Sequence, residues 1–479
     1  MSAQHDHPLD RGLRGCAAAV SSGEIGTLEL RVESLRRARD QADLNAYISL
    51  VDPSNGEPAS GPLASIPYAA KDNYCAIDTR TTCASRMLEH FVAPYDATVI
   101  ARLRRAGAAL IGKTNLDEFA MGSSNELSYF GAVHNPWDRE RVPGGSSGGS
   151  AVAVAAGSVP FALGSDTGGS VRQPAAFCGV SGFKPTYGRI SRHGLIAYAS
   201  SLDCPGIFAR SAEDCAIVFD AVAGHDARDA TSARCVADRC VDALERPLAG
   251  LRIGVASASS GAGVDDEVSR IVREALSEFE RQGAVLVDID LPHAALAIPA
   301  YYVIAPAEAS SNLSRYDGVR YGHRCDNPTS LDDLYERSRA EGFGAEVQRR
   351  IFIGTYVLSA GYYDAYYRRA QQVRRLIAND FDAAFERVDL IAAPTAPTVA
   401  FKLGEKTTDP LQLYASDINT VSANLAGVPA ISIPAGFSKG LPVGLQLTAA
   451  AFGEARLLAA AHQFQQVTDW HQRRPGAGR

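Results

Sequence analysis

Lysine is scarce in this chain of 479 residues. Only six of its 47 basic residues are lysines, and the other 41 are arginines. Because arginine supplies almost every positive charge, a retained lysine points to a property that arginine lacks, above all the ability to lose its proton near neutral pH. The candidates for such chemistry are the lysines at positions 71, 113, 184, 402, 406 and 439.

The sequence also lacks the segments that direct a chain into or across a membrane. The longest run of small apolar residues, Ala151 to Leu163, is interrupted by Gly157, Ser158 and Pro160. A membrane-spanning helix needs about 18 to 20 apolar residues without such interruptions. The first thirty residues contain no apolar stretch like that of a secretory signal peptide. We therefore expect a cytoplasmic protein that does not bind a membrane.

Disulfide and metal-binding patterns are missing as well. The nine cysteines are odd in number and include no Cys-x-x-Cys pair, and the ten histidines show no metal-ligand spacing. These features argue against a disulfide framework and a zinc site, so we expect reduced thiols and no metal. The net charge of −7 would repel a phosphate backbone, so direct binding of nucleic acid is not expected.

Strands and helices are predicted to alternate along the chain. Hydrophobic residues make up 46% and charged residues 21% of the sequence, which is typical of a protein with a large core. The alternation favours an open α/β sheet covered on both faces, in a single domain spanning residues 1–479. Its N-terminal helical segment would cover residues 1–50, and a polar linker residues 52–61.

The apolar spacing also sets the boundaries of the predicted elements. One helix begins at Thr27, with Leu28, Val32, Leu35 and Ala38 on one face. Two further helices are predicted over residues 97–106 and 265–282. The predicted strands are 45–51, 63–70, 108–112, 159–163, 251–256, 284–290 and 389–393.

A first glycine-rich loop spans Pro143–Ser150 and contains four glycines and three serines. Its backbone can therefore approach a ligand closely. A phosphate-binding loop would end in Gly-Lys-Ser or Gly-Lys-Thr, which is absent here. The Gly144-x-Ser146-x-Gly148 pattern matches a nucleophile elbow, but no buried strand precedes it. Composition alone leaves a flexible linker as the alternative.

A second loop, Asp166–Ser170, places consecutive backbone amides beside a serine hydroxyl. Such amides can hold the oxyanion that forms when a serine attacks a carbonyl, although a structural glycine turn has the same composition. Lys71 ends a predicted buried strand, where desolvation lowers a lysine pKa toward neutrality. A neutral lysine can act as a general base, and a buried ion pair is the alternative role for Lys71.

Taken together, the segments around Lys71, Ser146 and Ser170 resemble the amidase signature family. They match its motifs in order and in spacing, with 75 positions from Lys71 to Ser146 and 24 from Ser146 to Ser170. The resemblance implies that Ser170 is the nucleophile, that Ser146 follows a cis peptide bond and that Lys71 is the base. It also implies an α/β fold with a single mixed sheet of about eleven strands. The implied oxyanion donors are the amides of Thr167, Gly168 and Gly169.

Longer stretches are similar to the amidase subunits of tRNA-dependent amidotransferases, a branch of that family, from about Leu63 to His471. These stretches are residues 111–124, 165–179, 308–315 and 354–367. The resemblance implies that glutamine is the substrate and that Tyr301, Arg350 and Asp417 hold it. The chemistry agrees, because an arginine can pair with an α-carboxylate and an aspartate with an α-ammonium.

The resemblance further implies a heterotrimer with subunits B and C. A partner would bind ATP, magnesium and the tRNA, whereas this subunit would hold no cofactor. Ammonia from glutamine would then convert Glu-tRNA(Gln) or Asp-tRNA(Asn) to Gln-tRNA(Gln) or Asn-tRNA(Asn). Two alternatives stay open: a free-standing amidase that acts on another amide, and an inactive scaffold subunit.

Two stretches depart from the family pattern. The segment from Asn45 to Gly61 is short, and Ser124-Asn-Glu-Leu stands where Ser-Thr-Glu is usual.

Several other residues fit structural roles. We expect ion pairs at Lys113 and Lys184 and an inert core thiol at Cys178. Asp417 has helix capping near Ile418 as its alternative role. The tyrosines at 362, 363, 366 and 367 would form a helix face that packs in the core or against a partner.

Overall fold

The strands extend from the N-terminal third of the chain to its C-terminal part. The computed structural model describes residues 7–52, 60–235, 239–256, 263–407 and 409–476. The strands in these ranges are β1 (Tyr47–Leu50), β2 (Pro67–Lys71), β3 (Ala109–Thr114), β4 (Phe161–Asp166), β5 (Ser181–Lys184), β6 (Cys204–Ala209), β7 (Arg252–Ala256), β8 (Val285–Ile289), β9 (Leu390–Pro394), β10 (Ala430–Ser438) and β11 (Leu441–Ala449).

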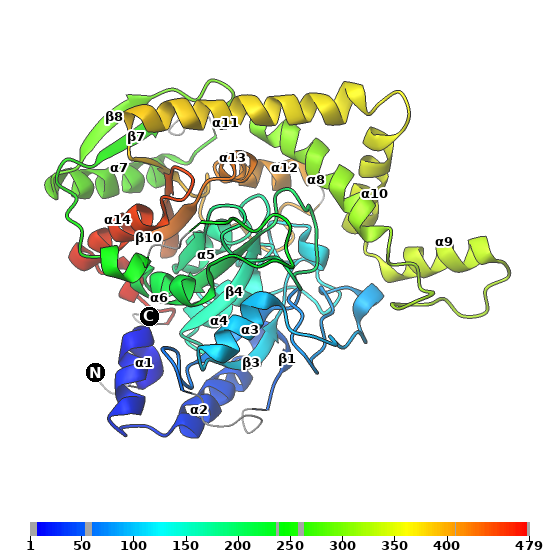
Figure 1. Cartoon of the computed structure of the whole chain (residues 1–479), viewed down its shortest axis with the longest axis horizontal. Coiled ribbons are helices and arrows are strands. Elements are labelled where there is room, and N and C mark those ends of the chain that lie inside the picture. Colours follow the sequence, from blue (N-terminus) through cyan, green and yellow to red (C-terminus); the bar gives the residue numbers. More distant parts are fainter. Residues whose placement is uncertain (1–6, 53–59, 236–238, 257–262, 408, 477–479) are drawn as a thin grey trace.

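All of these strands belong to one mixed sheet with the order β1-β3-β2-β4-β6-β5-β10-β11-β9-β7-β8 (Figure 1). Parallel pairs join β2 to β3 and β4, and β7 to β8 and β9. The other pairs are antiparallel. The prediction of a single mixed sheet of about eleven strands is therefore confirmed.

Helices connect the strands and extend beyond the sheet. They are α1 (Gly12–Ser21), α2 (Thr27–Asp40), α3 (Thr98–Arg105), α4 (Gly148–Ala155), α5 (Arg172–Cys178), α6 (Ala212–Val222), α7 (Asp266–Arg281), α8 (Ala297–Leu313), α9 (Leu331–Gly342), α10 (Ala345–Leu358), α11 (Arg369–Arg387), α12 (Pro410–Tyr414), α13 (Val421–Ala426) and α14 (Glu454–Val467). Figure 1 shows α9 extending to the right, away from the sheet. Among the described residues, no helix is long and apolar enough to span a bilayer.

Strand β11 shows how helices cover both faces of the sheet. Side chains alternate between the faces along a strand. At Gly444 a Cβ atom would lie 2.5 Å from the Cβ of Ala176, so this face packs against α5. The neighbouring Leu445 belongs to the large core cluster with Phe279 of α7 and Leu457 of α14. Helix α5, which follows the second glycine loop, is thus held against the middle of the sheet.

Two predicted elements differ from the structure in detail. Helix α2 begins at Thr27 as predicted, but Leu28 and Val32 are exposed. The helix is rotated because Ser34 donates a hydrogen bond to the Ser158 carbonyl and Arg37 donates one to the Gly157 carbonyl. Strand β2 begins at Pro67 rather than at residue 63. Most of the predicted linker 52–61 lies outside the described residues.

Candidate active site

Lys71 is the last residue of β2, between β3 and β4, and its side chain is fully buried. Its Nζ lies 2.7 Å from Ser146 Oγ, 2.9 Å from Ser147 Oγ and 2.9 Å from Ser165 Oγ. The serines come from the first glycine loop and from the end of β4. The fold thus surrounds the amino group of Lys71 with three serine hydroxyls.

Burial determines the protonation of Lys71. Desolvation lowers its pKa from 10.5 to about 7, against the opposing charges of Asp117, Asp166 and Asp203. Near neutral pH a large share of Lys71 is therefore uncharged and able to accept a proton. A buried ion-pair role, the alternative for this lysine, is wrong because no carboxylate of the described residues forms a salt bridge with it.

The three hydroxyls around Lys71 have different partners. Ser147 Oγ donates to the Ser165 carbonyl, at 3.1 Å, so it can only accept from Lys71. Ser165 Oγ accepts from Asn73 Nδ2 at 3.0 Å and from Lys71 at 2.9 Å. Ser146 Oγ lies nearest to Lys71 Nζ, at 2.7 Å, which is close enough for a proton to pass between these two groups.

The first glycine loop is fixed by contacts on both sides. The Gly145–Ser146 peptide bond is cis. The Gly145 amide donates to Gln173 Oε1 at 2.9 Å, and the Asp117 amide donates to the Ser146 carbonyl at 3.2 Å. A Cβ atom at Gly145 would lie 2.1 Å from Asp117 Oδ2, so only glycine fits there. Helix α4 begins at Gly148, so the last three residues of the glycine-rich segment form its first turn.

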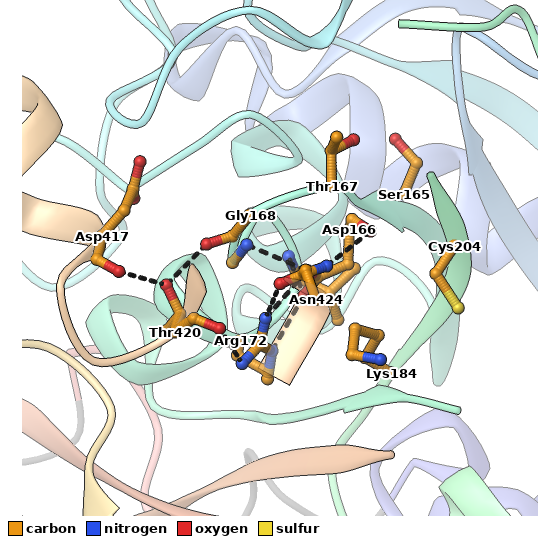
Figure 2. Close-up of polar contacts among 12 residues, drawn as sticks. Ser165, Asp166, Thr167, Gly168, Arg172, Lys184, Cys204, Asp417, Thr420 and Asn424 are labelled. Atoms are coloured by element: carbon orange, nitrogen blue, oxygen red, sulfur yellow. Dashed lines mark hydrogen bonds and ion pairs between the residues drawn. The ribbon is translucent and has the colours of Figure 1, made fainter. Parts of the chain in front are cut away.

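The second glycine loop is organised by Asp166, the last residue of β4 (Figure 2). Its carboxylate accepts from the amides of Gly169 and Val171 at 2.9 and 3.2 Å, and from Arg172 at 3.0 and 3.1 Å. Burial alone would raise its pKa, but the charge of Arg172 overcomes this and lowers the pKa to about 2. Arg172 is also fully buried and bonds Asn424 Oδ1 at 2.6 Å.

The predicted oxyanion donors, the amides of Thr167, Gly168 and Gly169, differ in their hydrogen bonds. The Gly169 amide donates to the Asp166 carboxylate, because the loop turns back over that side chain. The amides of Thr167 and Gly168 have no acceptor among the described residues. Thr167 and Gly168 thus have free N–H groups for a developing negative charge, whereas Gly169 would share its N–H with Asp166.

Ser170 lies at the end of this loop and is 9% exposed. Its carbonyl accepts from the Ser147 amide at 3.2 Å, which ties the two glycine loops together. Its hydroxyl forms no hydrogen bond with any residue in the described ranges. Ser170 therefore presents an unengaged hydroxyl on a loop that is hydrogen-bonded to Ser147, the neighbour of Ser146.

Two of the three predicted glutamine-binding residues are linked to this loop. Tyr301, on α8, packs on Gly168: a Cβ atom at Gly168 would lie 2.7 Å from Tyr301 Cζ. Thr420 Oγ1 lies 2.7 Å from the Gly168 carbonyl and 3.1 Å from the Asp417 carbonyl (Figure 2). The structure thus places Tyr301 and Asp417 next to the loop that carries Ser170.

Asp417 ends a short 3-10 helix, η9 (Ala415–Asp417), and is 6% exposed. Its Oδ2 accepts from Ser123 Oγ at 2.8 Å and from Tyr302 OH at 3.3 Å. Desolvation raises its pKa to about 7, despite these hydrogen bonds and the charge of Arg350. The capping alternative is wrong, because α13 begins only at Val421 and the carboxylate of Asp417 bonds other segments.

Arg350, on α10, is 2% exposed and lies in an aromatic cage. Its Nε donates to Glu346 Oε1 at 2.8 Å and its Nη1 to Tyr198 OH at 2.6 Å. Its Cζ lies 5.7, 5.4 and 5.4 Å from the ring centroids of Tyr198, Tyr302 and Tyr414. Its Nη2 has no hydrogen-bond partner among the described residues and is thus available to a ligand carboxylate.

The other candidates named from the sequence have structural roles. Lys113 forms a fully buried ion pair with Asp72, at 2.7 Å, as predicted. Lys184 was also expected in an ion pair, which is wrong within the described part of the chain. Lys184 Nζ donates instead to the carbonyls of Pro185 and Val428, at 2.9 and 2.6 Å, because β5 ends next to these two residues. Cys178 is buried as predicted, and burial raises the pKa of its thiol.

The Ser124-Asn-Glu departure is accommodated by the backbone. Asn125 has a φ of 64°, a left-handed conformation that asparagine tolerates better than threonine does. Its Oδ1 accepts from the Gly149 amide at 3.1 Å and so supports the start of α4.

Comparisons with known proteins agree with this geometry. The family described as Amidase matches residues 32–458. The A subunit of the glutamyl-tRNA(Gln) amidotransferase of Chromohalobacter salexigens is 58% identical over 483 residues, which cover 98% of this chain and 99% of that protein. The corresponding protein of Halorhodospira halophila, which has the same name, is 57% identical over 472 residues, covering 96% of this chain and 97% of that protein.

Solved structures give a similar result. The crystal structure of the glutamyl-tRNA(Gln) amidotransferase A subunit from Thermotoga maritima has a TM-score of 0.84 and 42% identity, and covers 97% of this chain and 96% of that one. A 6-aminohexanoate cyclic dimer hydrolase has a TM-score of 0.86 at 29% identity, covering 98% of this chain and 99% of that one. The same fold is therefore found in proteins with different names and different amide substrates.

Proposed function

The chain belongs to the amidase family, and we propose that it is the glutamine-hydrolysing subunit of a tRNA-dependent amidotransferase. The observation that carries this proposal is the pair of buried side chains of opposite charge type, Arg350 and Asp417, which both contact Tyr302 and of which Asp417 is linked to the loop of Ser170. An α-amino acid brings one charge of each sign to such a site. The relatives that share most of this chain carry the name of that subunit.

In the proposed reaction, Ser170 Oγ attacks the side-chain amide carbon of glutamine. Its proton passes through Ser146 to the neutral Lys71, whose Nζ lies 2.7 Å from Ser146 Oγ. The oxyanion is held by the amides of Thr167 and Gly168. Because the Ser170 hydroxyl is unengaged without substrate, the relay requires its contact with Ser146 to form on binding, as catalytic hydrogen bonds often do.

The second half of the reaction frees the enzyme. The amide nitrogen takes a proton back and leaves as ammonia, which leaves a γ-glutamyl ester on Ser170. Water then attacks this ester with Lys71 again accepting the proton, and glutamate departs. We propose that Tyr301 closes the pocket over Gly168, while Arg350 and Asp417 hold the α-carboxylate and the α-ammonium.

The same proposal extends to the assembly. This subunit supplies ammonia in the cytoplasm to a heterotrimer, in which subunits B and C accompany it and a partner binds ATP, magnesium and the misacylated tRNA. The residues in the described ranges contain no cluster of three or more His, Cys, Asp or Glu side chains that could hold a metal ion. The proposed chemistry of this chain uses the side chains and backbone amides described above.

The test is ammonia release from glutamine, measured with the chain alone and with co-purified subunits B and C. We expect slow release by the chain alone and faster release by the assembly. A free-standing amidase would instead hydrolyse a simple amide such as butyramide as well as it hydrolyses glutamine. An inactive scaffold subunit would release no ammonia in either setting.

A further inference from the structure

Tyr302 lies between the two charged groups of the site. Its hydroxyl is 3.3 Å from Asp417 Oδ2, and the Cζ atom of Arg350 is 5.4 Å from the centroid of its ring. Its ring is nearly perpendicular to that of Tyr301, with centroids 5.0 Å apart, and stacks on Tyr414 with a centroid distance of 3.8 Å. One side chain thus contacts the proposed ammonium ligand through its hydroxyl and the proposed carboxylate ligand through its ring.

Arg350 and Asp417 form no ion pair with each other in the part of the chain that is described. Arg350 pairs with Glu346 instead, at 2.8 Å, and Asp417 accepts from Ser123 and Tyr302. Opposite charges attract strongly in a poorly solvated site, so two such groups would join directly if nothing held them apart. A direct pair would satisfy both groups internally and leave neither for the two charges of an amino acid.

We propose that Tyr302 is a specificity-determining positioning residue, which holds Arg350 and Asp417 apart at the spacing of an α-amino acid head group. The ring separates the two charges, and the hydroxyl orients the Asp417 carboxylate. This inference rests on the proposed function, because it explains how the site would distinguish glutamine from an amide without a head group.

The surroundings of Tyr302 fix its position. The stack on Tyr414 is itself anchored, because Tyr414 OH donates to Glu346 Oε1 at 2.8 Å, the oxygen that also accepts from Arg350. The guanidinium of Arg350 lies beside this stack, with its Cζ 5.4 Å from the centroid of each ring. Tyr302 therefore cannot turn away from Asp417 without leaving this stack.

Three substrates separate the contributions of Tyr302 in the assembly of the full chain with subunits B and C. They are glutamine, glutaramate, which lacks only the α-ammonium, and butyramide, which lacks both charged groups. Tyr302→Phe removes the hydroxyl and keeps the ring. We expect KM for glutamine to rise about tenfold, the lower range for a lost hydrogen bond to a charged group, with kcat within about twofold. The kinetics of glutaramate and butyramide should be unchanged.

Tyr302→Leu removes the ring and lets the two charges approach each other. We expect a further rise in KM of about tenfold for glutamine, because a cation–ring contact and the separation are lost together, and a rise for glutaramate as well. Butyramide kinetics should stay at the wild-type level. The matched control is Tyr363→Phe, at a tyrosine that is 46% exposed outside the site, and it should change none of the three.

The outcomes distinguish this inference from the proposed function. If the wild-type assembly hydrolyses butyramide as well as glutamine, the proposed function and this inference both fail. If it prefers glutamine and Tyr302→Phe leaves that preference intact, or lowers all three activities equally, only the inference about Tyr302 fails. Because Tyr302→Phe keeps the packing of the ring, the result does not depend on the folding of Tyr302→Leu.

Discussion

Replacing Asp417 by asparagine is expected to separate substrate recognition from catalysis. Asparagine keeps the size of the side chain and can still bond Ser123 and Tyr302, so the change removes the charge alone. Asp417 is 6% exposed, so a bound ammonium would lose its partner in a mostly desolvated site. Removing one side of such a charge pair costs about 2 to 5 kcal/mol, which corresponds to about 30- to 4000-fold in affinity.

Protonation of Asp417 in the substrate-free enzyme reduces this expected loss of affinity only slightly. Burial raises the pKa of Asp417 to about 7, so Asp417 is protonated in about half of the molecules at pH 7 in the absence of substrate. Binding of an ammonium requires the ionised form, which lowers the apparent affinity of the wild type by only about twofold. The expected effect of Asp417→Asn is therefore still at least about tenfold, and it should appear in KM rather than in kcat.

The assay compares glutamine with glutaramate, which has no α-ammonium, at saturating and at limiting concentrations. Asp417→Asn should raise KM for glutamine and leave glutaramate unchanged. A thermal melt of the variant within about 1 °C of the wild type, which corresponds to about 1 kcal/mol in a chain of this length, excludes a general loss of structure. Equal losses on both substrates would refute Asp417 as the ligand of the amino group and favour the free-standing amidase.

Four further results are expected. Lys71→Arg should abolish acyl-enzyme formation although the positive charge remains, because arginine stays protonated, and wild-type-like turnover would show that Lys71 is not the base. Ser170→Ala should yield no γ-glutamyl adduct in mass spectrometry, and an adduct on another residue of the variant would contradict its role. Burial lowers the pKa of Lys71 to about 7 and raises that of Asp417 to about 7. The neutral form of Lys71 and the ionised form of Asp417 are therefore both lost as the pH falls through 7. The acid limb of log kcat/KM should therefore have a slope of about two for glutamine and about one for butyramide, and equal slopes would rule out one of the two groups. Arg172→Ala should lower the free energy of unfolding by about 3 to 5 kcal/mol in urea titrations, since it leaves Asp166 buried without its partner, and a loss below about 1 kcal/mol would show that the pair is not needed for stability.

The sequence indicates the parts of the fold that depend on local pattern. Helix α7 was predicted over residues 265–282 and spans Asp266–Arg281, because its apolar spacing is regular and Asp265 caps it by accepting from the Glu267 amide. Strand β9 was predicted over residues 389–393 and spans Leu390–Pro394. The rotation of α2 was not predictable in this way, because it is set by contacts with the Gly157 and Ser158 carbonyls, which lie more than a hundred positions away.

The residues of the candidate site likewise fall into those that the sequence indicates and those that only the folded structure shows. Lys71, Ser146 and Ser170 stand in segments with recognisable motifs, so resemblance was sufficient to name them. Thr420 and Tyr302 have no such motif, and their roles depend on contacts between segments that are distant in the sequence. The hydrogen bond from the Gly169 amide to Asp166 could not be predicted from the sequence, because it forms only once the loop is folded.

The low pKa of Lys71 depends on how the neighbouring carboxylates are bonded. Asp117, Asp166 and Asp203 all favour the protonated lysine. Asp166 is compensated by Arg172. Asp117 accepts from the amides of Asn125 and Leu127, and Asp203 accepts from those of Tyr198 and Ala199.

Because these partners stabilise the three carboxylates locally, the desolvation of Lys71 outweighs the attraction of their charges. The bond between Arg172 and Asp166 thus serves two purposes, since it shapes the loop of Ser170 and shields Lys71 from the charge of Asp166. Loss of Arg172 would let burial raise the pKa of Asp166, so the variant would lose much of the ionised carboxylate that accepts from the amides of Gly169 and Val171.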